Sequence, residues 1–279
     1  MNLLNSAVPP HTIRAEKLKG LVLDWAGTTV DFGSLAPART MERLFNTRDI
    51  ALSDAEARRH MGLPKKEHIR GILSIPRVVN AWRETHRQDP SDATVDDMYA
   101  EFIPLQFSCL EEYSAVIPKI PAMMEDFRRR GLKIGSTTGY TRAMLDLLMA
   151  TSATEGYVPD CSLTPEEVGA GRPHPFMMYA CAIRLQIYPM ASIAKIGDTP
   201  ADIQEGLNAG AWSIGVAGTG NRIGLSRDHF DSLSHAEKES RLVQARAELQ
   251  QAGAHYVVDS LPEVGPILDD IDARLKGGH

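Results

Sequence analysis

The feature that most constrains the fold is an alternation of short apolar runs with amphipathic helical stretches. Helical pattern fills the intervals between the runs, as in "PAMMEDFRRRG" and "PADIQEGLNAG". Parallel strands need long crossover connections, which helices supply on both faces of a sheet. The alternation therefore predicts an α/β fold built on a parallel sheet. The apolar runs that we interpret as strands are "GLVLD" (20–24), "LKIGSTT" (132–138), "IAKIGD" (193–198), "WSIGVA" (212–217) and "HYVVD" (255–259).

One region interrupts this alternation. Between about 34 and 105 the chain shows helical pattern and no convincing strand. We therefore expect residues 1–33 and 106–279 to form a Rossmann-like catalytic core of parallel strands flanked by helices. Residues 34–105 are expected to form an all-helical cap domain inserted after the first strand. A polar stretch at 227–253 is expected to add surface helices to the core.

The composition argues against several classes of function. The chain of 279 residues has a formal net charge of -6, which gives no general attraction to nucleic acid or anionic membranes. No stretch approaches the ~18 uninterrupted apolar residues of a membrane span. The N-terminal stretch lacks the apolar core of a signal peptide, and the three cysteines form no CxxC motif. We therefore expect a cytoplasmic protein without a nucleic-acid or membrane partner.

Three of the predicted strands end in polar residues that can carry chemistry. The first ends at Asp24, the second runs into Thr138 and Gly139, and the third ends at Asp198, with Asp202 four residues further on. In open parallel sheets, ligands bind outside the carboxyl ends of the strands. The fold can therefore place these groups side by side.

Together these groups suit a phosphoryl ligand and a divalent cation. Asp24 and Asp198 offer the oxygen ligands that Mg²⁺ prefers. The hydroxyl of Thr138 and the backbone N–H of Gly139 can hold phosphoryl oxygens, because a predicted helix begins directly after them. Arg172, in "GAGRPHPF", offers a fixed positive charge for the same anion. Asp24 is then the candidate nucleophile toward phosphorus.

These residues resemble the four motifs of the haloacid dehalogenase superfamily. The motifs occur in order as "DWAGT", "STTG", Arg172 and "GDTPAD". The longer stretches "LDWAGTTVDFGSLAP", "MGLPKKEHIR", "KIGSTTGYTR", "GRPHPFMMY" and "KIGDTPADIQEG" are similar to those of its members that cleave P–C bonds. The resemblance covers roughly residues 18 to 265. It implies a small-molecule phosphonate substrate, phosphonoacetaldehyde, with acetaldehyde and phosphate as products.

The sequence departs from the superfamily's phosphatases at Ala26, where most of them carry an Asp that protonates the leaving oxygen. Lys65, in the helical segment, is the candidate replacement. Pro64 favours a helix start there, and the helix dipole, the neighbouring Lys66 and burial all favour a neutral amine. A neutral amine can form an iminium with an aldehyde, and the iminium accepts the electrons of a breaking P–C bond.

The resemblance implies the following roles. Lys65 forms a Schiff base with the substrate, Asp24 attacks phosphorus, and water then hydrolyses the aspartyl-phosphate. Mg²⁺ is held by Asp24, the backbone carbonyl of Ala26 and Asp198. Asp202 orients the site without touching the metal.

Two further residues are expected to flank the imine. Met61 and His68 lie four residues before and three residues after Lys65, on one face if the helices are nearly continuous. The resemblance also implies a homodimer through the cap domains.

Two other interpretations stay open at this point. One is an oxygen-ester phosphatase or sugar-phosphate mutase of the same superfamily, which Ala26 disfavours. The other is a catalytically inactive protein that binds phosphate and acts as a regulator. The joint presence of Asp24, Thr138, Arg172 and Asp198 disfavours that second interpretation.

Overall fold

The computed structural model describes residues 15–277. The stretch on which the expected lack of a signal peptide depends lies largely outside the described residues. Among the described residues, no helix is both long enough and apolar enough to cross a membrane.

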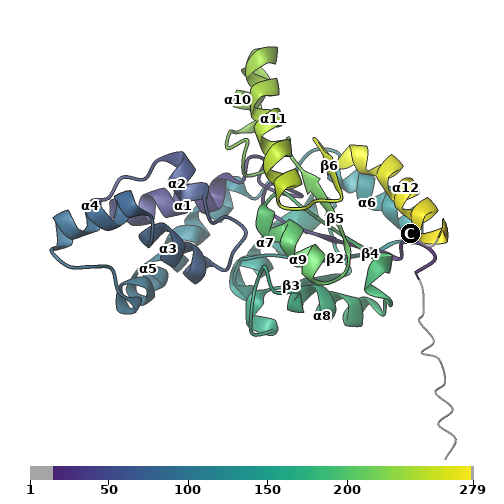
Figure 1. Cartoon of the computed structure of the whole chain (residues 1–279), viewed down its shortest axis with the longest axis horizontal. Coiled ribbons are helices and arrows are strands. Elements are labelled where there is room, and N and C mark those ends of the chain that lie inside the picture. The colour runs from purple at the N-terminus through teal and green to yellow at the C-terminus, as the bar shows by residue number, and fades with distance from the viewer. Residues whose placement is uncertain (1–14, 278–279) are drawn as a thin grey trace, which may run out of the picture.

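Six parallel strands form one sheet at the centre of the molecule (Figure 1). Their order is β3-β2-β1-β4-β5-β6, and every neighbouring pair is parallel. The predicted α/β fold is therefore confirmed. One strand, β3, was not predicted, because its sequence Cys-Ser-Leu is not a continuous apolar run. The strands are β1 (Gly20–Leu23), β2 (Lys133–Thr137), β3 (Cys161–Leu163), β4 (Ile193–Gly197), β5 (Trp212–Val216) and β6 (Tyr256–Val258).

The register brings the ends of the three central strands level. Leu23, the last residue of β1, pairs with Ser136 of β2 on one side and with Ile196 of β4 on the other. The polar residues that follow these strands therefore leave the sheet at the same edge. This edge is where the site forms.

Helices cover both faces of the sheet. Successive side chains of β1 point to opposite faces and all are buried, so both faces need a cover. Leu21 and Leu23 belong to the apolar cluster that includes α6, α7 and α12, whereas Val22 packs in the cluster with α8. The second face also carries α9 and α11. These covering helices are α6 (Ile120–Arg129), α7 (Arg142–Thr154), α8 (Phe176–Leu185), α9 (Pro200–Asn208), α11 (His235–Gln251) and α12 (Val264–Gly277).

Of the six helices between β1 and β2, the first five project to one side of the sheet (Figure 1). We call α1–α5 (35–113) the helical insert. Inside it, α1 and α3 both pack against α5. The separation of 34–105 as a domain stays a prediction, and α5 itself continues past residue 105. The helices are α1 (Leu35–Asn46), α2 (Asp54–Arg58), α3 (Lys65–Leu73), α4 (Pro76–His86) and α5 (Asp92–Tyr113).

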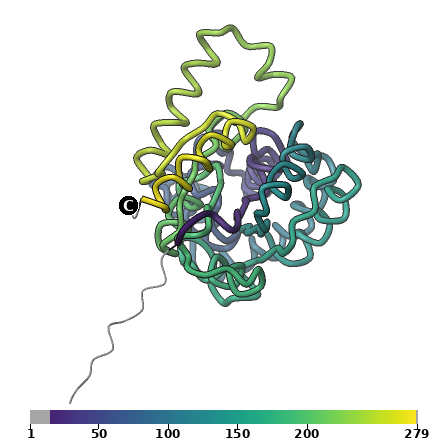
Figure 2. Tube along the Cα trace, turned by 90° about the vertical axis from the view of Figure 1, so that its right-hand side faces the viewer, coloured from purple at the N-terminus to yellow at the C-terminus, as the bar shows by residue number. Residues whose placement is uncertain are grey.

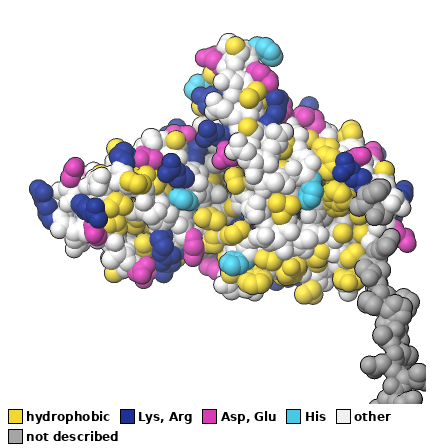
Figure 3. All heavy atoms as spheres, in the orientation of Figure 1, with side chains coloured by type: hydrophobic (Ala, Val, Ile, Leu, Met, Phe, Trp, Pro, Cys, Tyr) yellow, Lys and Arg dark blue, Asp and Glu magenta, His cyan; other side chains and the backbone are white. Residues whose placement is uncertain are grey.

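A helical arm, formed by α10 (Arg227–Ser232) and α11, projects from the sheet region in both views (Figures 1 and 2). It is the predicted pair of polar surface helices. Hydrophobic side chains gather on the surface over α8 (Figure 3), where Phe176, Tyr179 and Ile183 are exposed. Three short 3₁₀ helices complete the described elements: η1 (Pro165–Glu167), η2 (Met190–Ser192) and η3 (Leu261–Glu263).

Candidate active site

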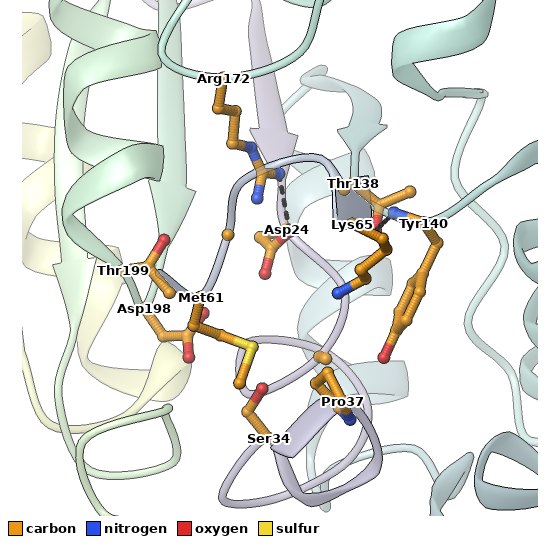
Figure 4. A pocket seen from close by; sticks show the side chains of 13 residues that line it. Asp24, Ser34, Pro37, Met61, Lys65, Thr138, Tyr140, Arg172, Asp198 and Thr199 are labelled. Carbon is orange, nitrogen blue, oxygen red and sulfur yellow. Dashed lines mark hydrogen bonds and ion pairs between the residues drawn. The ribbon is translucent and has the colours of Figure 1, made fainter. Parts of the chain in front are cut away.

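A small cavity lies between the carboxyl edge of the sheet and the helical insert (Figure 4). Both parts of the chain contribute to its wall. Of the ten site residues predicted from sequence, the structure brings eight to this wall: Asp24, Ala26, Met61, Lys65, Thr138, Gly139, Arg172 and Asp198. The other two, His68 and Asp202, lie buried behind it.

Asp24 follows β1 directly and is held at both its backbone and its side chain. Its N–H donates to the carbonyl of Ile196 at 2.9 Å, and its Oδ1 accepts from Nη2 of Arg172 at 2.7 Å. The second carboxylate oxygen points into the cavity (Figure 4). Burial raises the pKa of Asp24, and the charge of Arg172 acts against that rise. One oxygen is therefore tethered and the other is free to react.

Asp198 follows β4 and lies next to Asp24. Its Oδ2 accepts the backbone N–H of Asn221 at 2.6 Å. Burial, and then the charge of Asp24, raise the pKa of Asp198 well above its usual value. A Cβ on Gly27 would lie 2.3 Å from Oδ2 of Asp198, so the loop after β1 needs glycine to pack against this carboxylate.

The carboxylates fit a divalent cation. Oxygens of Asp24, Asp198 and Asp202 lie within 4.8 Å of one another, and all three residues are buried. Buried carboxylates at such distances repel each other unless a cation neutralises them. Oδ1 of Asp202 already faces Nη1 of Arg172 at 3.0 Å and Nζ of Lys195 at 2.9 Å. Asp24 and Asp198 are therefore the carboxylates available to a metal ion.

Lys65 is the first residue of α3 and reaches the cavity from the helical insert (Figure 4). Its Nζ lies 4.6 Å from the centre of the Tyr140 ring, and the residue is only 6% exposed. Burial lowers the pKa of Lys65 to about 8, the charge of Asp24 opposes this, and Arg172 contributes to it. Lys66, which the sequence argument included as a repelling charge, is ion-paired with Asp96. The lower pKa therefore comes mainly from burial.

The two residues expected to flank Lys65 have different positions. Met61 lies on the cavity wall, in the turn before α3. His68 is fully buried, and its Nε2 lies 2.8 Å from the carbonyl oxygen of Ala57. Burial and the charge of Lys65 lower the pKa of His68 to about 3, so its ring is neutral near pH 7. Its Nδ1 has no partner among residues 15–277.

Thr138 and Gly139 occupy the loop between β2 and α7, as the sequence predicts. The backbone N–H of Thr138 donates to the carbonyl of Leu163 at 3.2 Å, and its hydroxyl accepts the N–H of Tyr140 at 3.2 Å. A Cβ on Gly139 would lie 2.7 Å from the carbonyl oxygen of Leu63, just before α3 of the helical insert. Glycine is therefore needed where the two parts of the chain meet.

The sequence argument missed several residues of the wall. Ser34 and Pro37 come from the start of α1, and Tyr140 and Thr199 directly follow predicted site residues. Tyr140 is 3% exposed, and its hydroxyl has no partner within the described part of the chain. Its place next to Gly139 in "STTGYTR" was the available signal. Nothing comparable marks Pro37, which only the packing of α1 brings to the cavity.

Arg172 shows a role beyond that expected from sequence. Its guanidinium faces three carboxylates, with Nη2 on Asp24, Nη1 on Asp202 and Nε on Glu205. Burial opposes its charge, but these carboxylates raise the pKa of Arg172 above its usual value. The sequence argument did not select Glu205.

The fold and the site define a class of hydrolase. The family model described as "haloacid dehalogenase-like hydrolase" matches residues 18–210. The chain belongs to that family, and within it to the phosphonoacetaldehyde hydrolases, as three similar proteins show.

The phosphonoacetaldehyde hydrolase of Bacillus cereus is 38% identical over 92% of this chain and 98% of its own length. A bifunctional phosphonoacetaldehyde hydrolase/aminoethylphosphonate transaminase of Clostridioides difficile is 40% identical over 93% of this chain, which spans 41% of that longer protein. The crystal structure of a phosphonoacetaldehyde hydrolase-like protein from Oleispira antarctica matches with a TM-score of 0.93 and 36% identity. That match covers 95% of this chain and 96% of the other.

Proposed function

We propose that this chain hydrolyses the P–C bond of phosphonoacetaldehyde to acetaldehyde and phosphate, with Mg²⁺ as its metal ion. The relatives' names support the substrate. The observation that carries the proposal is the buried amine of Lys65 in one cavity with Asp24, while Ala26 stands where a phosphatase needs an acid. The cavity therefore offers an amine and a carboxylate nucleophile to one small substrate.

In the first step, the neutral amine of Lys65 attacks the aldehyde carbon. One proton is taken up from solvent, water leaves, and a protonated imine joins Nζ to the aldehyde carbon. The lowered pKa of Lys65, about 8, raises the fraction of neutral amine at pH 7 to roughly 10%. The hydroxyl of Thr138 and the N–H of Gly139 hold the oxygens of the phosphono group, which fixes phosphorus beside Asp24.

In the second step, the free oxygen of Asp24 attacks phosphorus. The P–C bond breaks, its electron pair moves into the iminium, and an enamine on Lys65 leaves in place of a carbanion. Water then attacks the aspartyl-phosphate and releases phosphate. The enamine carbon takes up a proton, and hydrolysis of the resulting imine releases acetaldehyde and restores the amine.

Mg²⁺ would be held by Asp24, the carbonyl of Ala26 and Asp198, and it would offset the negative charge that gathers around the phosphono group. We place Asp202 outside the ligand set, because its Oδ1 is engaged by Arg172 and Lys195. A cap domain at 34–105, a homodimer through it and a cytoplasmic location stay predictions of the sequence.

Reductive trapping tests the proposal. Borohydride added with phosphonoacetaldehyde should attach the substrate's carbon fragment to Lys65, which peptide mass spectrometry locates. Lys65→Arg should abolish both trapping and turnover, because a guanidinium does not form the imine. Lys66→Arg is the matched control, since the neighbouring side chain is ion-paired with Asp96.

Trapping separates the rival functions. An oxygen-ester phosphatase or mutase would turn over phosphate esters with no adduct on Lys65, and an inactive regulator would release no phosphate. Normal P–C cleavage by Lys65→Arg would refute covalent catalysis by this amine.

A further inference from the structure

A closed group of buried polar side chains lies behind the proposed nucleophile, and the reaction steps above do not use it. Lys195 of β4 and Glu205 of α9 both have an exposed fraction of 0%. A buried charge is costly unless it is paired and hydrogen-bonded. Their partners are Thr137, Asp202 and Arg172, and the last of these touches the nucleophile itself.

Glu205 binds one edge of the guanidinium. Its Oε2 accepts Nε–H of Arg172 at 3.0 Å and the hydroxyl of Thr137 at 2.9 Å. Nζ of Lys195 lies 3.3 Å from the same oxygen and donates to Oγ1 of Thr137 at 2.9 Å. Nη2 of Arg172 donates to that hydroxyl oxygen at 2.9 Å and to the carbonyl of Thr137 at 2.7 Å. The four side chains therefore hold one another in a single arrangement.

The guanidinium of Arg172 links Glu205 to Asp24. Its N–H groups point in fixed directions in one plane, so a partner on Nε also sets the direction of Nη2. Nη2 holds Oδ1 of Asp24 at 2.7 Å, and the other oxygen of Asp24 is left to face the cavity. A small rotation of the guanidinium would move both oxygens.

We infer that Glu205 and Lys195 are positioning residues, which act through Arg172 to aim one oxygen of Asp24 at phosphorus. The inference rests on the proposed function for the reaction that it serves. Glu205 supplies the carboxylate that fixes Nε of Arg172. The positive charge of Lys195 offsets the desolvation cost of this fully buried carboxylate. Neither side chain lines the cavity, so neither touches the substrate.

The test uses Glu205→Gln, which keeps the shape and removes the charge, together with Lys195→Met. Lys133→Met is the matched control, because Lys133 lies at the opposite end of β2 and donates to the carbonyl of Leu185. We expect both site variants to lose ~100-fold in kcat, as misplaced reacting groups do, with KM changed less than ~3-fold. Borohydride trapping on Lys65 should persist, since imine formation does not need Asp24.

The double variant, Glu205→Gln with Lys195→Met, separates positioning from stability. It removes one charge of each sign, so the melting temperature should recover toward that of the parent. The kcat should stay low, because Nε of Arg172 still lacks its carboxylate. A merely structural role predicts the opposite, with kcat recovering together with the melting temperature.

The inference is overturned if folded Glu205→Gln keeps kcat within ~3-fold of the parent, or if kcat follows the melting temperature across the three variants. Its failure can be told apart from failure of the proposed function. If the parent protein neither cleaves phosphonoacetaldehyde nor forms an adduct on Lys65, the function is wrong. Crystal structures then still decide the positioning: Glu205→Gln should show Arg172 turned away from Asp24, and an unmoved guanidinium would refute it.

Discussion

Replacing Lys65 by methionine tests the burial of its amine through stability alone. Methionine is unbranched and of similar length, so it can fill the same space without a charge. The fold lowers the pKa of Lys65 from 10.5 to about 8, chiefly through burial. At ~1.4 kcal/mol per pKa unit, this fall corresponds to about 3 kcal/mol by which the charged amine destabilises the fold. Lys65→Met should therefore stabilise the protein at neutral pH.

The dependence on pH follows from the proton balance. Below pH 8 the amine is charged in both the folded and the unfolded chain, so the full penalty is present. Between about 8 and 10.5 the unfolded chain keeps a proton that the folded chain has released, so the penalty declines as the pH rises. The gain from Lys65→Met should be about 3 kcal/mol at pH 7, about 2 at pH 9 and about 1 at pH 10.

Urea unfolding followed by circular dichroism at these three pH values measures the difference between variant and parent. Lys66→Met serves as control, because its exposed ion pair with Asp96 should change the free energy of unfolding by less than ~1 kcal/mol. A Lys65→Met protein no more stable than the parent at pH 7 would contradict the argument. So would a gain that is equal at pH 7 and pH 10.

Three further predictions concern the contact between the helical insert and the sheet, and the metal ion. Arg58→Met removes the bond from the guanidinium to Oδ1 of Asn221 at 3.2 Å, so unfolding should become easier by about 2 kcal/mol in urea titrations and KM should rise. Gly62→Ala puts a Cβ 2.4 Å from Oγ1 of Thr199, and steady-state kinetics should show kcat reduced ~10-fold. Chelation with EDTA should abolish turnover and added Mg²⁺ restore it, while calorimetry should show weaker Mg²⁺ binding to Asp198→Asn.

The edge of the sheet could be predicted because it depends on local pattern. An apolar run that ends in Asp24 or Asp198 marks a strand end, and parallel strands bring their ends together. The strand β3 was missed because its sequence, Cys-Ser-Leu, is not an apolar run, whereas the equally short β6 is Tyr-Val-Val. The sequence also indicated Lys65 correctly as a residue of the cavity wall, but it could not rank burial above the helix dipole as the cause of its low pKa.

The positioning network could not be predicted from the same pattern. Lys195 sits inside an apolar strand, and Glu205 sits in a helix where a charged residue is usually solvent-exposed. Only the packing of α9 against β4 turns both inward, where Glu205 contacts Lys195 and Arg172. His68 illustrates the same limit, because its spacing from Lys65 was consistent with the wall, whereas its ring is buried against Ala57.

The division of the site between two parts of the chain makes the reactivity of the amine depend on their contact. Lys65 belongs to the helical insert, and Tyr140 of the β2–α7 loop covers it. Gly62 and Gly139 let the two backbones meet, since a Cβ on either would collide with the other side. At a pKa of about 8 roughly 10% of the amine is neutral at pH 7, whereas at 10.5 only about 0.03% is. An insert that moved away from the sheet would expose Lys65 to water and return its pKa toward 10.5, where almost all of the amine is charged at pH 7. The amine therefore becomes a nucleophile only where Asp24 is within reach of the same substrate.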